Sequence, residues 1–267
     1  MFRRIAMGTL LAIVIGCVGL NGIVSAQSLP SAGNLSVIVS ADVQTEGPAL
    51  VYRYSLTNDR SSLQDVAQFA ILSAGVQGIE ITSTPTDWLS NNSIGGHELT
   101  GWTPLGRALV RPGQTVSGFS LRAESLPAIV DAVVVGFIPF EKLPEFQDGL
   151  APDSAPESSV LENSRRIRVL GPVAVPVQFD AIAFLDHIVR LKDEAAALGW
   201  IDRSGIEVSL AAKLNAALES LKQQQTGTAR NQLQSCLREL DAQGGKHLAK
   251  DAVALLSANI AYLLSRL

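Results

Sequence analysis

The last third of the chain carries its clearest pattern, in which apolar residues recur with the period of an α-helix. The first such segment covers about residues 180–198 and lines one face with Phe184, Leu185, Ile188, Leu191, Ala195 and Leu198. Two more segments share one spacing, with Leu210, Leu214, Ala217, Leu218 and Leu221, then Ala229, Leu233, Cys236, Leu237 and Leu240. A fourth runs from about residue 248 to the end, with Ala252, Leu255, Leu256, Tyr262 and Leu263. Bundle helices bury stripes of this kind. Short connections make neighbouring helices antiparallel, so we expect a small antiparallel bundle of about four helices.

Start and stop signals place the ends of these helices. Asp180 is suited to be the N-cap of the first helix, and Gly199 fits its C-terminal cap. The run Ser204-Gly205-Ile206-Glu207 has the spacing of a capping box before the second helix. Either Thr226 or Thr228 begins the third. We therefore expect the helical domain to cover residues 179–267.

Within residues 34–170, several short segments alternate between apolar and polar positions with the period of a β-strand. In residues 49–58, for example, Tyr52, Tyr54 and Leu56 share one face. The other expected strands are residues 35–40, 66–72, 79–82, 107–111, 116–123, 132–138 and 166–170. Several short strands separated by Gly, Pro, Asn and Ser turns are typical of a β-sandwich. The predicted fold is therefore multidomain, all-β then all-α, with an antiparallel Ig-like β-sandwich before the bundle.

Composition changes twice between the sandwich and the bundle. Residues 139–164 contain four prolines and six acidic residues against one lysine, which predicts an acidic, proline-containing loop within the sandwich. Residues 171–178 are rich in proline, and we expect them to form a stiff linker between the two domains.

The first 26 residues have the pattern of a signal peptide. Arg3 and Arg4 precede an apolar stretch, and Val24-Ser25-Ala26 offers small residues for cleavage before Gln27. The apolar run is shorter than a bilayer span needs, so we expect no stable transmembrane span after cleavage. A competing interpretation is lipid anchoring through Cys17. Either way, the protein is expected to be exported to the periplasm, the cell surface or the medium.

Removal of the signal changes both the charge and the cysteine content. It takes away two of 21 basic residues and no acid, which leaves 19 basic and 25 acidic residues. Residues 27–178 hold 9 basic and 15 acidic residues, a balance that argues against nucleic acid as a partner. Cys236 is then the one cysteine that remains, which excludes a disulfide within the chain. Because it lies on an apolar helix face, we expect a buried thiol.

Several short motifs in the helical region resemble the FIMAH-type C-terminal domain of exported bacterial proteins. They are Gly199-Trp200-Ile201, residues 209–217, Asn231-Gln232-Leu233, Gly245-Lys246-His247-Leu248 and Ala261-Tyr262-Leu263-Leu264. The phenylalanine common in the third helix of that family is replaced here by Cys236 or Leu237. The resemblance implies a helical domain without assigned catalytic residues, usually attached to other exported domains that are often hydrolases. The first domain is only generically like a bacterial Ig-like sandwich.

The sequence contains no recognisable catalytic site. His97-Glu98-Leu99-Thr100-Gly101 begins like a zinc-protease motif but lacks its second histidine. The other histidines, His187 and His247, lie in separate segments. Phosphate-binding loops, dinucleotide fingerprints and serine-hydrolase elbows are missing from the sequence. We therefore assign no catalytic, cofactor-binding or metal-ligating residue.

Two tryptophans are the candidates for contact with a ligand or partner. Trp88 and Trp102 lie in segments rich in Thr, Gly, Asn and Pro that read as loops. An exposed ring there could stack on a sugar or a protein surface. In the alternative, both rings turn inward and cover the open end of the core.

The leading hypothesis is an exported, non-enzymatic binding protein whose protein or polysaccharide partner is unknown. The alternative is a secreted hydrolase or carbohydrate-binding accessory, with its site built from sandwich loops near Trp88, His97 and Trp102. A third hypothesis is an assembly partner that works by edge-strand pairing.

Overall fold

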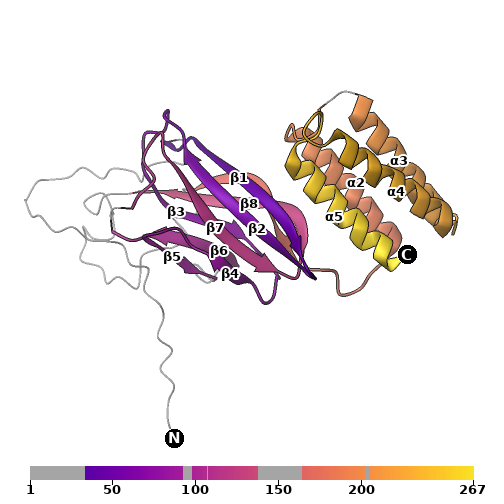
Figure 1. The fold of residues 1–267 in the computed structure, drawn as a ribbon, viewed down its shortest axis with the longest axis horizontal. Helices are drawn as coiled ribbons and strands as arrows, with labels where there is room; N and C mark the ends of the chain where they lie inside the picture. The colour runs from indigo at the N-terminus through magenta and orange to yellow at the C-terminus, as the bar shows by residue number, and fades with distance from the viewer. Residues whose placement is uncertain (1–33, 93–97, 107, 138–163, 203–204) are drawn as a thin grey trace, which may run out of the picture.

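The computed structural model describes residues 34–92, 98–106, 108–137, 164–202 and 205–267. Figure 1 shows strands in the first part of the chain and helices grouped at one end of them. Two predicted segments fall outside the described residues: the signal peptide and nearly all of the acidic loop. Within the described ranges, no helix combines the length and apolar character that crossing a bilayer requires.

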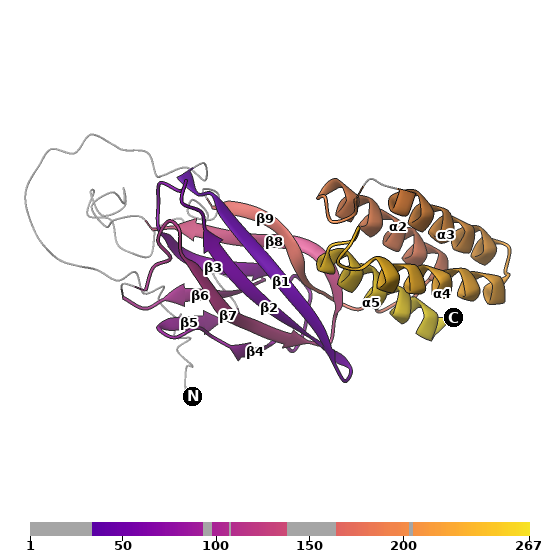
Figure 2. The same ribbon diagram turned by 45° about the horizontal axis from the view of Figure 1, so that its top comes forward.

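The strands form two antiparallel sheets, which confirms the expected sandwich. The four-stranded sheet has the order β1-β2-β7-β4, with β1 Val37–Glu46, β2 Ala49–Asn58, β7 Thr115–Ala123 and β4 Glu80–Ser83. The five-stranded sheet has the order β5-β6-β3-β8-β9, with β5 Trp88–Asn91, β6 Leu99–Pro104, β3 Val66–Leu72, β8 Leu126–Gly136 and β9 Arg165–Val173. Figure 2 shows both sheets beside the bundle.

The sequence pattern located most strands but not all of their ends. Strands β2 and β3 have the expected bounds. Strand β8 begins at Leu126, six residues before the expected start at residue 132. Strand β9 continues through Gly171 and Pro172 to Val173, so the first part of the expected linker belongs to the sandwich. Because β9 is the last strand of its sheet, the missing N–H of Pro172 leaves no gap in an inner ladder.

Three segments of the sandwich differ from the prediction. The expected strand at residues 107–111 is wrong: apart from Arg107, which is not described, the segment contributes only an isolated bridge from Val110 to Val66. Strands β5 and β6 were expected to be loops, yet they pair with each other from Trp88↔Pro104 to Asn91↔Gly101. Glycine, proline and asparagine in these short strands conceal the alternation of apolar and polar residues that marks a strand in a sequence.

The core of the sandwich is aromatic where the two sheets face each other. Tyr54, Phe69, Trp102 and Phe119 are at most 2% exposed. The Phe69 and Trp102 rings are stacked with centroids 5.6 Å apart, and Phe119 lies 5.0 Å from Phe69. The inward alternation of Tyr52, Tyr54 and Leu56 that the sequence predicted is confirmed.

The four helices follow the predicted faces. They are α2 Ala181–Ala197, α3 Gly205–Lys222, α4 Thr226–Gln243 and α5 Lys250–Arg266. The Asp180 side chain accepts a hydrogen bond from the Ala183 N–H at 2.7 Å, as an N-cap should. Gly199 has a φ of 75° after the end of α2, a conformation that glycine adopts without strain. The expected capping box includes Ser204, which lies outside the described residues.

Two of the motifs that carry the family resemblance meet at one end of the bundle. The Asp202 N–H donates to the His247 carbonyl at 2.9 Å, and the Ala249 N–H donates to the Trp200 carbonyl at 2.8 Å. Ile201 and Leu248, both buried, form a β-bridge between these bonds. The Gly199–Ile201 and Gly245–Leu248 motifs therefore hold the end of α2 against the connection between α4 and α5.

The bundle packs against the sandwich through α5 and α2. Helix α5 contacts strands β8 and β1, and α2 contacts β8. Asn259, only 1% exposed, donates from its side-chain amide to the Pro127 carbonyl in β8 at 2.9 Å. Arg168 in β9 pairs with Asp131 at 3.0 Å and also with Glu194 of α2. Hydrogen bonding, charge and apolar packing thus join the two parts of the chain.

Candidate functional site

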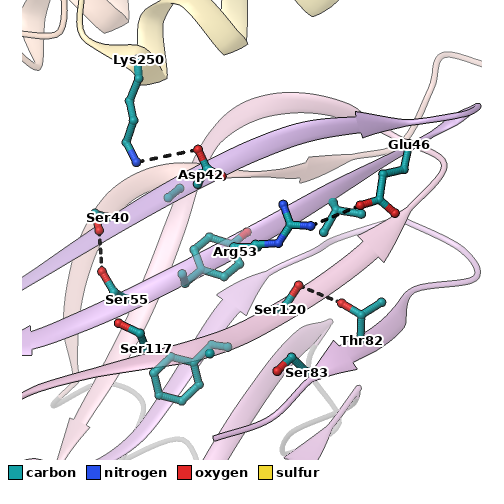
Figure 3. A pocket seen from close by; sticks show the side chains of 15 residues that line it. Ser40, Asp42, Glu46, Arg53, Ser55, Thr82, Ser83, Ser117, Ser120 and Lys250 are labelled. Atoms are coloured by element: carbon teal, nitrogen blue, oxygen red, sulfur yellow. Dashed lines mark hydrogen bonds and ion pairs between the residues drawn. The ribbon is translucent and has the colours of Figure 1, made fainter. Parts of the chain in front are cut away.

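A groove crosses the outer face of the four-stranded sheet and has a volume of about 540 Å³. We call it the hydroxyl groove, because its lining includes six hydroxyl side chains: Ser40, Ser55, Thr82, Ser83, Ser117 and Ser120. They come from all four strands of the sheet. Figure 3 shows them together below the first turn of α5.

Two β-bulges lie in the wall of the hydroxyl groove. Tyr54 opposes Phe119 whereas Ser55 opposes Ser117, so Gly118 is the extra residue of β7. Its φ of 98° is open to glycine and strained for other residues. In β4, Thr82 is extra in the same way between Ile81 and Ser83. Bulges bend a strand and redirect its side chains, so they account for a hollow in an otherwise regular sheet.

The hydroxyls of the groove bond to one another across strands. Ser40 and Ser55 lie 2.6 Å apart between β1 and β2, and Thr82 and Ser120 lie 2.8 Å apart between β4 and β7. Each hydroxyl has one donor and two acceptor positions, so a paired hydroxyl can still take part in a further hydrogen bond. The floor can therefore bind polar ligand groups as a donor and as an acceptor.

The charges at the rim of the groove are paired. Arg53 and Glu46 lie 3.2 Å apart, and Lys250 of α5 lies 4.0 Å from Asp42. These side chains are well exposed, and ion pairs of this kind contribute little to stability. Their effect here is to leave the rim nearly neutral. Because Lys250 belongs to the bundle, both parts of the chain line the groove.

The lining offers hydrogen bonding without an obvious catalytic pair. A serine nucleophile needs a base within hydrogen-bond reach. No histidine or cysteine is found among the described residues that line the groove, and its two carboxylates lie in the ion pairs just named. In the described part of the chain, no cluster of three His, Cys, Asp or Glu side chains could hold a metal ion.

Both candidate contact residues are buried in the sandwich. Trp88 is 6% exposed and Trp102 is 0% exposed. Trp88 lies edge-on to Phe119 with ring centroids 5.0 Å apart, and Trp102 belongs to the aromatic core. This placement agrees with the alternative in which the rings turn inward, and neither ring offers a free face for stacking. His97, the third member of the expected loop site, lies outside the described residues.

The two other histidines and the cysteine that was expected to be buried lie in the bundle. His187 on α2 is half-buried; burial, with a smaller effect of Arg190, lowers the pKa of its imidazole. His247 lies at the exposed end of the bundle, 3.2 Å from the Asp202 carboxylate. Cys236 is buried as expected, and burial raises the pKa of its thiol to about 12.

Sequence reasoning did not find the hydroxyl groove. Its residues are outward-facing serines and threonines, which a strand places on any solvated face. Ser40, Thr82 and Ser120 are far apart along the chain, and only the order β1-β2-β7-β4 brings them together. The one available signal was the number of hydroxyl side chains at outward positions of neighbouring strands.

Two of the solved structures that resemble this chain are distant from it in sequence. One is an uncharacterized protein from Nocardia farcinica with an immunoglobulin-like fold, 15% identical, with a TM-score of 0.30 over 51% of this chain and 98% of that chain. The other is the chitin-binding domain of Chi18aC from Streptomyces coelicolor, 16% identical, with a TM-score of 0.28 over 36% of this chain and 90% of that chain. Comparison with curated proteins found no match.

Residues 185–265, which make up most of the bundle, match the FIMAH domain, and the resemblance that the sequence motifs indicated is thereby confirmed.

Proposed function

We propose that this protein is an exported, non-enzymatic binding protein whose ligand or partner lies in the hydroxyl groove. The observation that carries the proposal is the groove itself: six hydroxyls from four strands, gathered in a hollow of about 540 Å³. Polar side chains gathered in a hollow are what a binding site needs, whereas the described lining lacks a nucleophile with an adjacent base.

Charge supports a ligand that is not strongly ionic. The rim charges of the groove are paired as Arg53 with Glu46 and Lys250 with Asp42. An excess of acids over bases in residues 27–178 also disfavours polyanions such as nucleic acid. Export is part of the same proposal and rests on the pattern of the first 26 residues. Export can be checked from the mass of the protein recovered outside the cytoplasm, because cleavage before Gln27 would remove residues 1–26.

A secreted hydrolase or carbohydrate-binding accessory is the alternative. The site of such a protein was expected near Trp88, His97 and Trp102. Both tryptophans are buried, so the stacking surfaces that such a site would use are missing. A hydrolase would therefore need loops that do not include these two rings. Turnover of a peptide, ester or glycoside by the purified chain would favour this alternative.

The test is a pull-down from envelope and medium fractions with the chain from Gln27 to Leu267. Ser55→Phe blocks the groove at a half-buried position of β2. Thr57→Phe is the matched control, because Thr57 lies two residues along the same face of β2 and likewise pairs with a hydroxyl, that of Thr115 at 2.8 Å. Phenylalanine suits strands, so both variants should fold.

The outcomes separate the proposal from its competitors. We expect a stoichiometric protein or polysaccharide to be retained by the wild type and by Thr57→Phe but lost by Ser55→Phe. Equal retention by all three chains would place the contact elsewhere and overturn the assignment to the groove. An empty pull-down together with turnover in a substrate screen would overturn the binding function.

A further inference from the structure

A second hollow lies where the sandwich, the linker and the bundle meet. It has a volume of about 330 Å³ and lies against Leu126 of β8, Val173 of β9, Pro176 of the linker, Phe179 just before α2, and Phe184 and His187 of α2. We call it the junction pocket. Figure 2 shows the connection from β9 to α2 that forms one of its sides. Pockets at domain interfaces with apolar walls and a few polar groups are typical small-molecule sites.

The walls of the junction pocket favour a flat aromatic molecule. The Phe179 and Phe184 rings have centroids 5.7 Å apart, and Tyr262 of α5 packs behind both at 5.8 and 5.2 Å. Phe184 is itself buried and the Arg266 guanidinium lies 6.0 Å from the Phe179 ring centroid, so a ligand ring would pack by edge or offset contact against the parts of these rings that remain accessible. The pocket is near the lower limit of ligand-site volumes, so it suits a compact molecule rather than a polymer.

His187 is a half-buried polar group that the fold leaves unused in this pocket, and Gln178 is a second, exposed polar side chain of the lining. Within the described residues, neither ring nitrogen of His187 has a hydrogen-bond partner. Burial and the nearby Arg190 lower the pKa of the imidazole, with Glu194 opposing them, so the fold favours the neutral ring. A neutral imidazole has one N–H donor and one nitrogen acceptor. Both are available to a ligand.

Two other polar side chains at the pocket already have bonds within the protein. The Asp180 carboxylate accepts from the Ala183 N–H, and the Asn259 amide nitrogen donates to the Pro127 and Leu255 carbonyls. The negative charge of Asp180 disfavours an anionic ligand. We propose that the junction pocket binds a small, uncharged aromatic molecule that forms a hydrogen bond with His187.

This site is separate from the hydroxyl groove and does not depend on the function proposed for it. The two recesses have no lining residue in common. They also differ in chemistry, since one offers hydroxyls and the other aromatic rings with a single imidazole. A ligand of the junction pocket would contact the sandwich and the bundle at once.

Indole is a suitable probe, because it is uncharged and aromatic and carries one N–H that can donate to the imidazole. The measurement is titration of the purified chain from Gln27 to Leu267 with indole, followed by calorimetry and by the ¹⁵N signals of the histidine rings. N-methylindole has the same ring system without the donor. We expect saturable binding of indole that shifts the His187 signals but not those of His247, and weaker binding of N-methylindole.

Three substitutions make the test specific. Ala183→Phe puts a ring into the lining of the pocket at an exposed position, and Ile182→Phe places the same ring at the neighbouring exposed residue outside the lining. His187→Phe keeps the bulk of a ring and removes its nitrogens. We expect indole affinity to fall at least about tenfold in Ala183→Phe, the equivalent of 1.4 kcal/mol, and to stay unchanged in Ile182→Phe.

The His187→Phe variant tests the hydrogen bond itself. It should bind indole and N-methylindole equally, because the preference of the wild type for indole depends on the imidazole. Indole binding that survives Ala183→Phe, or that never saturates, would overturn the proposed site. An unchanged preference for indole in His187→Phe would overturn the role of His187.

Discussion

Asn259 is the residue whose replacement tests most directly how the bundle is fixed to the sandwich. Its amide nitrogen donates to the Pro127 carbonyl in β8 at 2.9 Å and to the Leu255 carbonyl of its own helix at 2.8 Å. The residue paired with Pro127 in β9 is Pro172, which has no N–H to donate. A side chain of α5 supplies the donor to this carbonyl.

The magnitude follows from what Asn259→Ala leaves behind. The Leu255 carbonyl keeps the backbone bond of its helix, whereas the buried Pro127 carbonyl loses the donor described above. An unsatisfied buried acceptor costs about 1–3 kcal/mol of folding free energy. For a chain of this size, each kcal/mol lowers the unfolding temperature by about 2–4 °C. We expect Asn259→Ala to unfold about 2–12 °C below the wild type.

Calorimetric unfolding of the chain from Gln27 to Leu267 is the assay, with two further variants. Asn259→Leu keeps most of the side-chain volume but has no donor, so it should also lower the unfolding temperature. Ser257→Ala on the same helix changes a half-buried side chain for which no hydrogen bond is found among the described residues, and it should stay within about 0.5 kcal/mol of the wild type. An Asn259→Leu chain as stable as the wild type would refute the hydrogen-bond argument. Faster hydrogen exchange near the start of β8, with β2 unchanged, would locate the loss at the junction.

Three further predictions concern Gly171, Cys236 and Asp251. Gly171→Ala should destabilise the sandwich by about 1–3 kcal/mol in urea unfolding, because its Cβ would lie 2.3 Å from the Val130 side chain, whereas Gly227→Ala, with open space around it, should be neutral or stabilising. Cys236 should resist thiol reagents at pH 8 until the chain unfolds, since burial raises its pKa to about 12; rapid labelling of the native chain would contradict this. Burial raises the pKa of Asp251, with Lys250 opposing the shift and Asp42 adding to it, so the folded chain holds this proton more tightly than the unfolded chain. Ionisation of Asp251 therefore reduces stability as the pH rises above 3.8 through the folded pKa, and Asp251→Asn should be stabilising at pH 7 with the gain lost in acid; an equal gain at every pH would contradict this.

The bundle could be predicted closely because its signals are local. A helix face repeats over four or five turns, and its ends are marked by residues such as Asp180 and Gly199 within the same segment. Each signal needs only the neighbours along the chain to be read correctly. The sandwich offered equally clear signals in β2 and β3, where the alternation is uninterrupted.

The misplaced ends of β8 and β9 share a physical cause. Proline and glycine were read as breaks, yet Pro127, Gly171 and Pro172 all lie within paired strands. A strand at the edge of a sheet, such as β9, tolerates them because one side of its backbone makes no ladder. Whether a strand lies at an edge depends on the order of the whole sheet, and that order cannot be read from the residues of one segment.

The candidate sites could not be predicted for a related reason. An outward serine has the same local pattern whether it faces open solvent or a groove, and the hydroxyl groove depends on pairing among β1, β2, β7 and β4. The tryptophans show the opposite case. Trp88 and Trp102 were predicted to lie in loops, where they could contact a ligand, but both lie in strands that turn their rings into the core.

The bundle is more than an appendage of the sandwich, because it contributes to both recesses. Lys250 of α5 borders the hydroxyl groove, and Phe184, His187 and Asn259 border the junction pocket. The Asn259 amide also donates to the carbonyl of Pro127, which lies opposite Pro172 in the β8–β9 ladder. A sandwich expressed without the helices would keep the serine and threonine floor of the groove. It would lose the bundle side of the junction pocket, and the Pro127 carbonyl would lose its Asn259 donor. Ligand binding in the two recesses should therefore respond differently to removal of the bundle: weakened in the hydroxyl groove and abolished in the junction pocket.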